Sequence, residues 1–235
     1  MRIMPRISVL IFVFVATAAL PMRAQSVFSM RRDDPHAVNL ERGALGAAAD
    51  GKADDAAAIQ AAIDRVQETT EQGIVFVGEG RCRISRTIHL WTGIRLIGYG
   101  VHRPVFVLGA NTPGFQEGHE FLGTGRYMLQ FASRRPAAGE PVVDANEFTF
   151  YSGISNLDFE IREGNPAAIA VRFHVAQHSF LQHMRFHVGD GRAAFLCSRR
   201  NDCPHGWREL AADATGIAVA ALSCWRRAPG GKRGR

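Results

Sequence analysis

The sequence predicts an all-β solenoid, a parallel β-helix whose N-terminal end is covered by a single helix. Residues 54–66 carry apolar side chains at helical spacing, and the stretch 74–99 then holds short β-prone runs separated by glycines or polar pairs. Further along, residues 154–188 repeat one apolar pattern three times. A helix followed by many short strands fits a stack of coils whose open end needs a cover.

The predicted helix begins at a pair of aspartates. The carboxylate of Asp54 or Asp55 can accept hydrogen bonds from the free N–H groups of the first turn, and Gly73 is a plausible stop. One apolar stripe follows this start: Ile59, Ala62, Ile63 and Val66. We interpret Asp50, Asp54 and Asp55 as structural caps and turn residues, because each has a ready backbone partner.

Strands are expected directly after Gly73. Four runs combine β-branched or aliphatic residues with short polar or glycine breaks: Ile74–Val77, Cys82–Ser85, Thr87–Leu90 and Ile94–Tyr99.

The repeat lies in three segments that begin at Ile154, Ala168 and Leu181. Each has apolar residues at positions 1, 4, 6 and 8, and the starts are 14 and then 13 residues apart. The first and third segments are therefore separated by 27 residues, which predicts that they lie on the same wall in adjacent coils. Asn156 and residues 164–166 provide turns between walls.

Two carboxylates alternate with the apolar residues of the first repeat. Asp158 and Glu160 are predicted to face outward, with Arg185 and His187 beside them on the next coil. The lumen would then be lined by three side chains: Leu157, Phe159 and Ile161. A glycosidase needs a pair of outward carboxylates. A cationic neighbour lowers a carboxyl pKa, however, so we interpret this row mainly as a charge ladder and only secondarily as catalytic.

No cofactor or metal is expected. Four histidines follow in a strand-like stretch, where helical convergence of residues four apart does not apply: His174, His178, His183 and His187. Cys197, Cys203 and His205 lack a fourth ligand at zinc-like spacing.

The N-terminus has the pattern of an export signal. Arg2 and Arg6 precede an uncharged apolar run of 14 residues, Ile7 to Leu20, and cleavage is expected after Ala24. This run is shorter than the roughly 20 residues that span a bilayer. The mature protein is therefore expected to be secreted or periplasmic, with no membrane association after the signal is removed.

The net charge of +6 is unevenly distributed. Three of the 28 basic residues lie in residues 1–24, and eight lie in residues 197–235 with three of the 22 acidic residues. Residues 25–196 therefore hold 17 basic and 19 acidic residues, which argues against a nucleic-acid partner.

The residue composition and the hydrophobic pattern of the chain change near residue 196. Residues 197–235 lack strand-like alternation and end in a basic, glycine-rich stretch, so we expect disorder there. Because a solenoid is stabilised by further coils, we interpret this tail as the product of a lost reading frame or a shortened gene. A native, loosely folded extension is the alternative. The predicted organisation is a signal peptide (1–24), a linker (25–38), a partial β-helix (39–196) and this tail.

The segment from Phe173 to Leu181, FHVAQHSFL, together with the entry over residues 45–99, resembles the right-handed parallel β-helices of the pectate-lyase-like superfamily. It is most similar to glycoside hydrolase family 55, the β-1,3-glucanases, over residues 39–196. In that family a glutamine in a similar run helps to position water and sugar. The resemblance thus implies that Gln177, with His178 beside it, binds substrate and positions water. A turn amide that stacks on its neighbour is the structural alternative for Gln177. The family's general acid has no counterpart in this chain.

Three functions remain open. The first is the N-terminal part of an exported, inverting β-1,3-glucan hydrolase, which we expect to be inactive in this form. The second is a non-catalytic, polysaccharide-binding β-helix of the adhesin or tailspike type. The third is a pectate-lyase-type enzyme, although the sequence shows no triple acidic cluster suited to Ca²⁺. All three have a polysaccharide, β-1,3-glucan or pectin-like, as partner.

Overall fold

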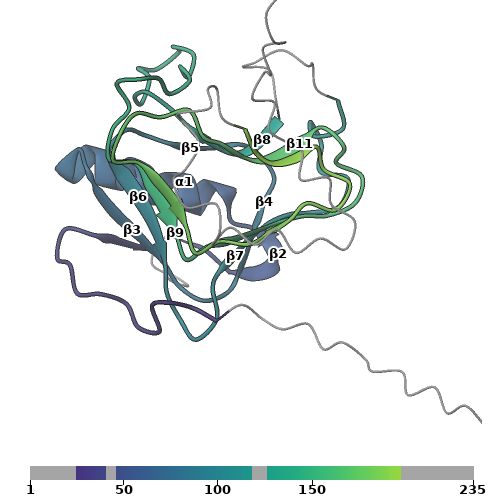
Figure 1. Cartoon of the computed structure of the whole chain (residues 1–235), viewed down its shortest axis with the longest axis horizontal. Coiled ribbons are helices and arrows are strands. Elements are labelled where there is room, and N and C mark those ends of the chain that lie inside the picture. The colour runs from purple at the N-terminus through teal and green to yellow at the C-terminus, as the bar shows by residue number, and fades with distance from the viewer. Residues whose placement is uncertain (1–24, 41–45, 118–125, 197–235) are drawn as a thin grey trace, which may run out of the picture.

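The computed structural model describes residues 25–40, 46–117 and 126–196. Within these ranges the chain winds through three parallel sheets that form the walls of a β-helix, as predicted (Figure 1). The export signal and the basic tail lie outside the described residues.

Each wall is a sheet of parallel strands. The first wall consists of β1 (Val38–Leu40), β3 (Gly73–Val77), β6 (Ile94–Gly98), β9 (Gly153–Ser155) and β12 (Phe180–Gln182). The second consists of β2 (Asp50–Asp54), β4 (Arg81–Ile84), β7 (Val105–Leu108), β10 (Asp158–Ile161) and β13 (Phe186–His187). The third consists of β5 (Ile88–Leu90), β8 (Arg126–Phe131), β11 (Ala168–Arg172) and β14 (Ala193–Leu196).

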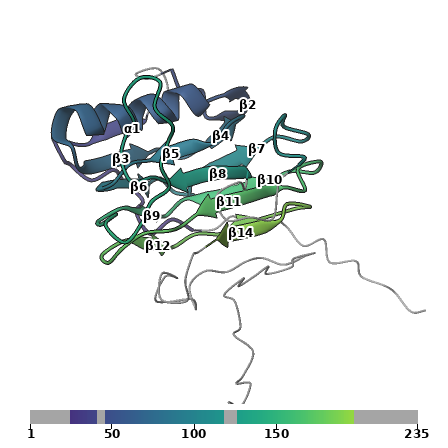
Figure 2. The same ribbon diagram turned by 90° about the horizontal axis from the view of Figure 1, so that it is seen from above.

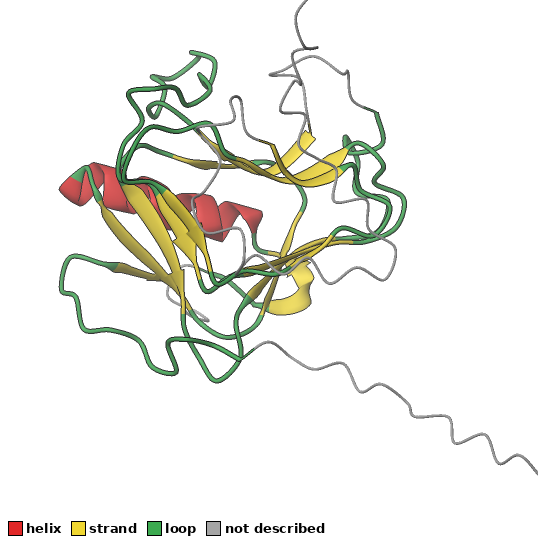
Figure 3. Ribbon diagram, in the orientation of Figure 1, coloured by secondary structure: helices red, strands yellow, loops and turns green. Residues whose placement is uncertain are grey.

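Successive coils contribute one strand to each wall, and loops connect the walls at the corners (Figure 3). The four strands expected between residues 74 and 99 are present as β3 to β6. Phe159 pairs with Phe186 and Glu160 with His187, which confirms the predicted register of the first and third repeats. The coils therefore stack so that equivalent residues lie directly above one another.

The lumen is filled by apolar side chains that stack from coil to coil. Phe106, Phe159 and Phe186 are fully buried on the second wall, and each of the two neighbouring ring pairs has centroids 5.6 Å apart. On the third wall Phe131 and Phe173 make an edge-to-face contact at 5.0 Å. The predicted inward positions Leu157, Phe159 and Ile161 all belong to this core.

The helix α1 (Ala56–Thr70) lies across the N-terminal end of the stack (Figure 2). Its predicted apolar stripe is fully buried. The side-chain amide of Gln60 accepts a hydrogen bond from the His89 N–H (2.9 Å) and donates one to the His89 carbonyl (3.1 Å). Gln60 thus takes the place of a neighbouring strand along the edge of β5, which satisfies backbone groups that the end of a sheet leaves unpaired.

The ends of α1 differ from the expectation in two details. Asp55 occupies the N-cap position, but its carboxylate makes no capping hydrogen bond and instead accepts the N–H groups of Ala48 (2.6 Å) and Ala49 (3.2 Å). The carboxylate of Asp54 accepts the N–H of Ala56 at 3.1 Å. The helix ends at Thr70, before Gly73, because Glu71 adopts φ 61°.

Asp50 and Asn156 organise the backbone near the start of the solenoid. The Asp50 carboxylate accepts the N–H groups of Lys52 (2.8 Å) and Ala53 (2.9 Å) within the irregular strand β2. The buried Asn156 side chain accepts the Val27 N–H and donates to the Gly98 carbonyl, at 2.9 and 2.7 Å. The segment that starts at residue 25 is thereby held against the first wall. Among the described residues, no helix is long and apolar enough to cross a membrane.

Candidate functional site

A cluster of polar side chains lies on the outer face of the third wall. Arg172 ends β11, His174 follows it two residues later, and Gln130 is the register partner of Arg172 on β8. Asp144 reaches them because residues 143–145 fold back against the end of β8, through an antiparallel bridge between Ala132 and Asp144. We call Gln130, Asp144, Arg172 and His174 the Asp144 cluster.

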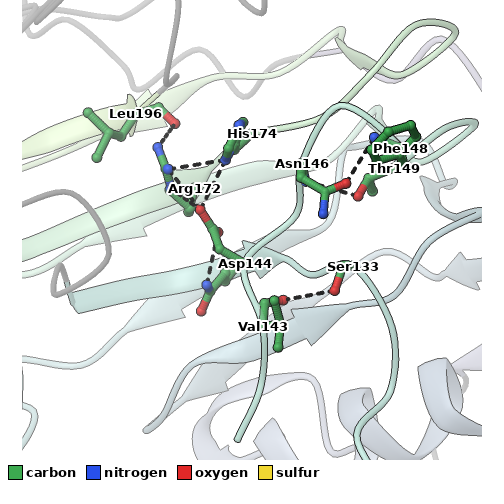
Figure 4. Close-up of polar contacts among 10 residues, drawn as sticks. Ser133, Val143, Asp144, Asn146, Phe148, Thr149, Arg172, His174 and Leu196 are labelled. Carbon is green, nitrogen blue, oxygen red and sulfur yellow. Dashed lines mark hydrogen bonds and ion pairs between the residues drawn. The ribbon is translucent and has the colours of Figure 1, made fainter.

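The carboxylate of Asp144 is the centre of this cluster (Figure 4). Arg172 donates to Oδ2 through Nη2 (2.8 Å) and Nε (3.2 Å). His174 Nδ1 lies 3.1 Å from the same oxygen, and Gln130 Nε2 donates to Oδ1 at 3.0 Å. Both oxygens of this loop carboxylate are therefore engaged by groups from two adjacent coils, Gln130 from one and Arg172 and His174 from the next.

Charge compensation keeps Asp144 ionised. Its partial burial raises the pKa, but the hydrogen bonds from His174 and Arg172 and the charge of Arg172 outweigh this and lower the pKa below its usual value. The Arg172 side chain is only 3% exposed, so its role is to hold Asp144 and not to reach a ligand. Asp144 and His174 are 28% and 23% exposed, so solvent can reach both.

His174 has the geometry of a general base or acid. Its Nδ1 lies 3.1 Å from the ionised carboxylate and 3.5 Å from Arg172 Nη2. The shorter contact, with the carboxylate, favours the tautomer that carries the proton on Nδ1 and leaves the Nε2 lone pair free. Nε2 has no hydrogen-bond partner within the described residues and is not enclosed. The Asp144–His174 pair can therefore accept or deliver a proton at the surface of the wall.

A corner beside the Asp144 cluster brings Gln177 and His178 to the surface. These two exposed residues form the turn between β11 and β12. The turn lies against the end of the loop before β9, because the Ala176 N–H donates to the Thr149 carbonyl at 2.8 Å. The His178 ring stacks on Tyr151, with centroids 5.3 Å apart. The substrate-binding candidates from sequence therefore lie near His174.

Asp158 lies away from the Asp144 cluster, and the prediction that its side chain is exposed to solvent is wrong. It lies on the second wall, is 7% exposed, and forms an ion pair with Arg103 at 2.9 Å. Its carboxylate also accepts the Arg185 N–H at 2.8 Å. Burial raises the pKa of Asp158 in spite of Arg103, so the expected lowering of the pKa is wrong as well.

Glu160 is half-buried on the same wall and is neutralised by two arginines. Its carboxylate contacts Arg81 at 2.5 Å and Arg162 at 3.0 Å. Burial raises its pKa, but these two partners outweigh it and lower the pKa, as a charge ladder predicts. His187 is its register partner, but the ion pairs come from arginines on β4 and just after β10. Asp158 and Glu160 therefore do not form a free carboxylate pair.

Little in the sequence indicates the Asp144 cluster. Arg172 and His174 alternate with the apolar residues of the second repeat, which is a usable signal, although a histidine in this stretch first suggests a metal ligand. Asp144 lies in an irregular loop with no periodicity. In the described ranges no group of three or more histidine, cysteine, aspartate or glutamate side chains is placed to hold a metal ion.

Several solved structures are similar to this chain at low sequence identity. Similar solved structures include ORF18 of Geobacillus virus E2, with 21% identity, TM-score 0.39, and coverage of 68% of this chain and 25% of that one. The A-module of the mannuronan C-5 epimerase AlgE4 of Azotobacter vinelandii gives 18% identity, TM-score 0.36, and coverage of 68% and 48%. PfbA, a surface adhesin of Streptococcus pneumoniae, gives 15% identity, TM-score 0.32, and coverage of 71% and 41%.

This chain thus spans less than half the length of each of these structures. No curated protein matches its sequence. The family model for rhamnogalacturonase A/epimerase, pectate lyase-like, matches residues 43–216, well over half of the chain. The chain therefore belongs to the rhamnogalacturonase A/epimerase family of pectate-lyase-like proteins.

Proposed function

We propose that this chain is exported and acts on a pectin-like polysaccharide, a polyuronate, with His174 as the base that removes a proton from the sugar. The observation that carries this proposal is the Asp144–His174 pair, whose carboxylate is held ionised and whose imidazole reaches the surface. Membership of a family named for a rhamnogalacturonase and an epimerase supports a polysaccharide substrate. A secreted or periplasmic location, expected from residues 1–24, belongs to this proposal.

The proposed reaction is one that a single base can begin. His174 Nε2 would take the proton from C5 of a uronate, next to its carboxylate. The electron pair then either expels the oxygen at C4, which is protonated by water, or takes a proton back on the opposite face. Either course begins with one base. Hydrolysis needs two carboxyl groups, and the three carboxylates considered for it here, Asp144, Asp158 and Glu160, are each paired with an arginine.

Hydrolysis of β-1,3-glucan is the second candidate, and the exposed position of Gln177 close to His174 favours it. There the base would activate water, and the glutamine would position it, as the resemblance to glycoside hydrolase family 55 implies. Inverting hydrolysis also requires a general acid with a raised pKa. We therefore expect no reducing-sugar release from β-1,3-glucan by this chain.

His174→Asn tests the proposed base. In D₂O, the wild-type chain should exchange the C5 proton of polygalacturonate for deuterium or form an unsaturated product. His174→Asn should reduce kcat by at least about 100-fold, the usual contribution of a general base, with KM little changed. Asp144→Asn should reduce kcat roughly 10–100-fold, because it removes the group that orients the imidazole. Proton NMR and ultraviolet absorbance read the two products directly.

His187→Asn is the matched control, because His187 is an exposed histidine on the second wall, away from the cluster. It should leave the rate unchanged. Binding of polygalacturonate without exchange or elimination would identify a binding-only module of the adhesin type and reject the base. Sugar release from laminarin that His174→Asn abolishes would favour the hydrolase instead.

A further inference from the structure

Two aromatic side chains are exposed on the loop that precedes β9. Phe148 is 74% exposed and Tyr151 is 45% exposed. They are the only aromatic residues among the strongly exposed large hydrophobic residues of the described ranges. Two exposed aromatic side chains three residues apart indicate a binding surface more specifically than scattered aliphatic side chains do. Large aromatic rings carry much of the binding energy at recognition surfaces.

Tyr151 presents a prepared flat surface. Its ring lies almost parallel to that of His178, with an angle of 9° between the planes and 5.3 Å between the centroids. The Phe150 ring is tilted beside it at 6.2 Å. Because His178 comes from a different coil, the stack is a contact between the loop before β9 and the turn before β12. Each ring stabilises the orientation of the other, and the Tyr151 side chain stays accessible to solvent.

The backbone on both sides of this stack is held in a costly conformation. Tyr151 has φ 58° and His178 has φ 61°, values that an ordinary residue adopts at a cost of about 1 kcal/mol or more. Histidine adopts this region more readily than most residues, so the cost falls mainly on Tyr151. Strain of this kind often accompanies a functional requirement for the side chain. Here it orients two rings at the same surface.

Hydrogen bonds fix the loop that carries the rings. Arg95 donates through Nε to the Tyr151 carbonyl at 3.1 Å, and the Gly93 N–H donates to the Phe150 carbonyl at 3.2 Å. The Phe148 N–H donates to Asn146 Oδ1 at 2.9 Å. A ring that is held before the ligand arrives loses little conformational entropy on binding. The surface is therefore preorganised and does not need to form on binding.

We propose that Phe148, Tyr151 and His178 form a stacking platform for a pyranose ring of the polysaccharide, next to the Asp144 cluster. This inference rests on the proposed function and names one of its binding subsites. A pyranose ring offers a face of C–H groups that packs on the electron-rich face of an aromatic ring. Phe148 lies on the same loop as Asp144 (Figure 4), and so does Tyr151 in the sequence. His178 is four residues from His174. One sugar chain can therefore contact both the platform and the Asp144 cluster.

Tyr151→Ala tests the platform without relieving the backbone strain, because alanine keeps its Cβ. By calorimetry of the full chain with polygalacturonate fragments, Tyr151→Ala should weaken binding at least about 10-fold, and Phe148→Ala should weaken it less. Tyr151→Trp should retain binding, because it retains a flat ring. Val101→Ala, at an exposed residue in the turn before β7, should change nothing. In turnover assays the platform variant should raise KM and leave kcat unchanged.

The outcomes separate this inference from the proposed function. Wild-type binding that Tyr151→Ala leaves intact would overturn the platform, while the role of His174 would still be decided by its own variant. A loss of kcat in His174→Asn with binding unchanged, together with weaker binding in Tyr151→Ala, supports both. If the wild-type chain binds neither polygalacturonate nor laminarin, both the platform and the proposed function are rejected. Thermal melting of each variant excludes loss of fold as the cause.

Discussion

Replacing Phe159 with alanine should lower the free energy of unfolding by roughly 3–5 kcal/mol, the usual cost of removing a buried aromatic ring. Phe159 is fully buried at the centre of the lumen, between Phe106 on the preceding coil and Phe186 on the following one. Its loss leaves a cavity that neither neighbour can fill, because both are fixed by their own strand pairing. Chemical denaturation with a fluorescence readout measures the change.

Phe148→Ala is the matched control for this experiment, because it deletes the same ring from a position that is 74% exposed. It should change the free energy of unfolding by less than about 0.5 kcal/mol, as is usual for surface substitutions. Equal costs for the two variants would contradict the assignment of Phe159 to the interior. A large cost for Phe148→Ala alone would show that the exposed loop has a structural role that the platform does not require.

The parts of the fold that sequence predicted are those fixed by local periodicity. The stripe from Ile59 to Val66 defined the buried face of α1, and the spacing of the repeats defined the pairing of Phe159 with Phe186. Both patterns arise because burial selects every second residue of a strand or one face of a helix. In a solenoid the same rule applies to each coil, so a repeat length is sufficient to predict which strands are neighbours.

The candidate site could not be predicted in the same way. Asp144 reaches Arg172 only because an irregular loop folds back along the end of β8, and no periodicity encodes that path. The stack of Tyr151 on His178 likewise joins a loop and a turn from different coils. The exposure of Asp158 was mispredicted for a related reason. Its strand position does alternate with the lumen residues, but Arg103, from the segment before β7, covers it.

Arg103→Met should therefore destabilise the protein at neutral pH by roughly 3–5 kcal/mol, since removing one member of a buried ion pair leaves the other charge uncompensated. The Arg103 and Asp158 side chains are only 9% and 10% exposed. Arg103 also donates through Nη1 to the His183 carbonyl at 3.0 Å, so the substitution removes this hydrogen bond as well as the ion pair. Methionine keeps much of the aliphatic stem, so the change reports mainly on the charge.

The cost of Arg103→Met should depend on pH in a defined direction. Burial already raises the pKa of Asp158, and removing Arg103 removes the charge that opposes this effect. A carboxyl group whose pKa is higher in the folded state stabilises the fold below its unfolded pKa, about 3.9, and this contribution is lost as the pH rises through the folded pKa. The difference between variant and wild type should therefore be largest near pH 7 and should shrink toward pH 4. Denaturation curves across this range provide the measurement.

The double variant Arg103→Met/Asp158→Asn separates the charge from the packing. Asparagine is neutral and still offers an oxygen to the Arg185 N–H, which Asp158 accepts at 2.8 Å. If the unpaired carboxylate causes the loss of stability, the double variant should recover most of it at pH 7 and should lose the pH dependence. A double variant as unstable as Arg103→Met, or a cost that stays constant from pH 4 to pH 7, would show that Arg103 acts through its packing and its bond to His183. In that case the ion pair between Arg103 and Asp158 would not be what stabilises the contact between these two coils.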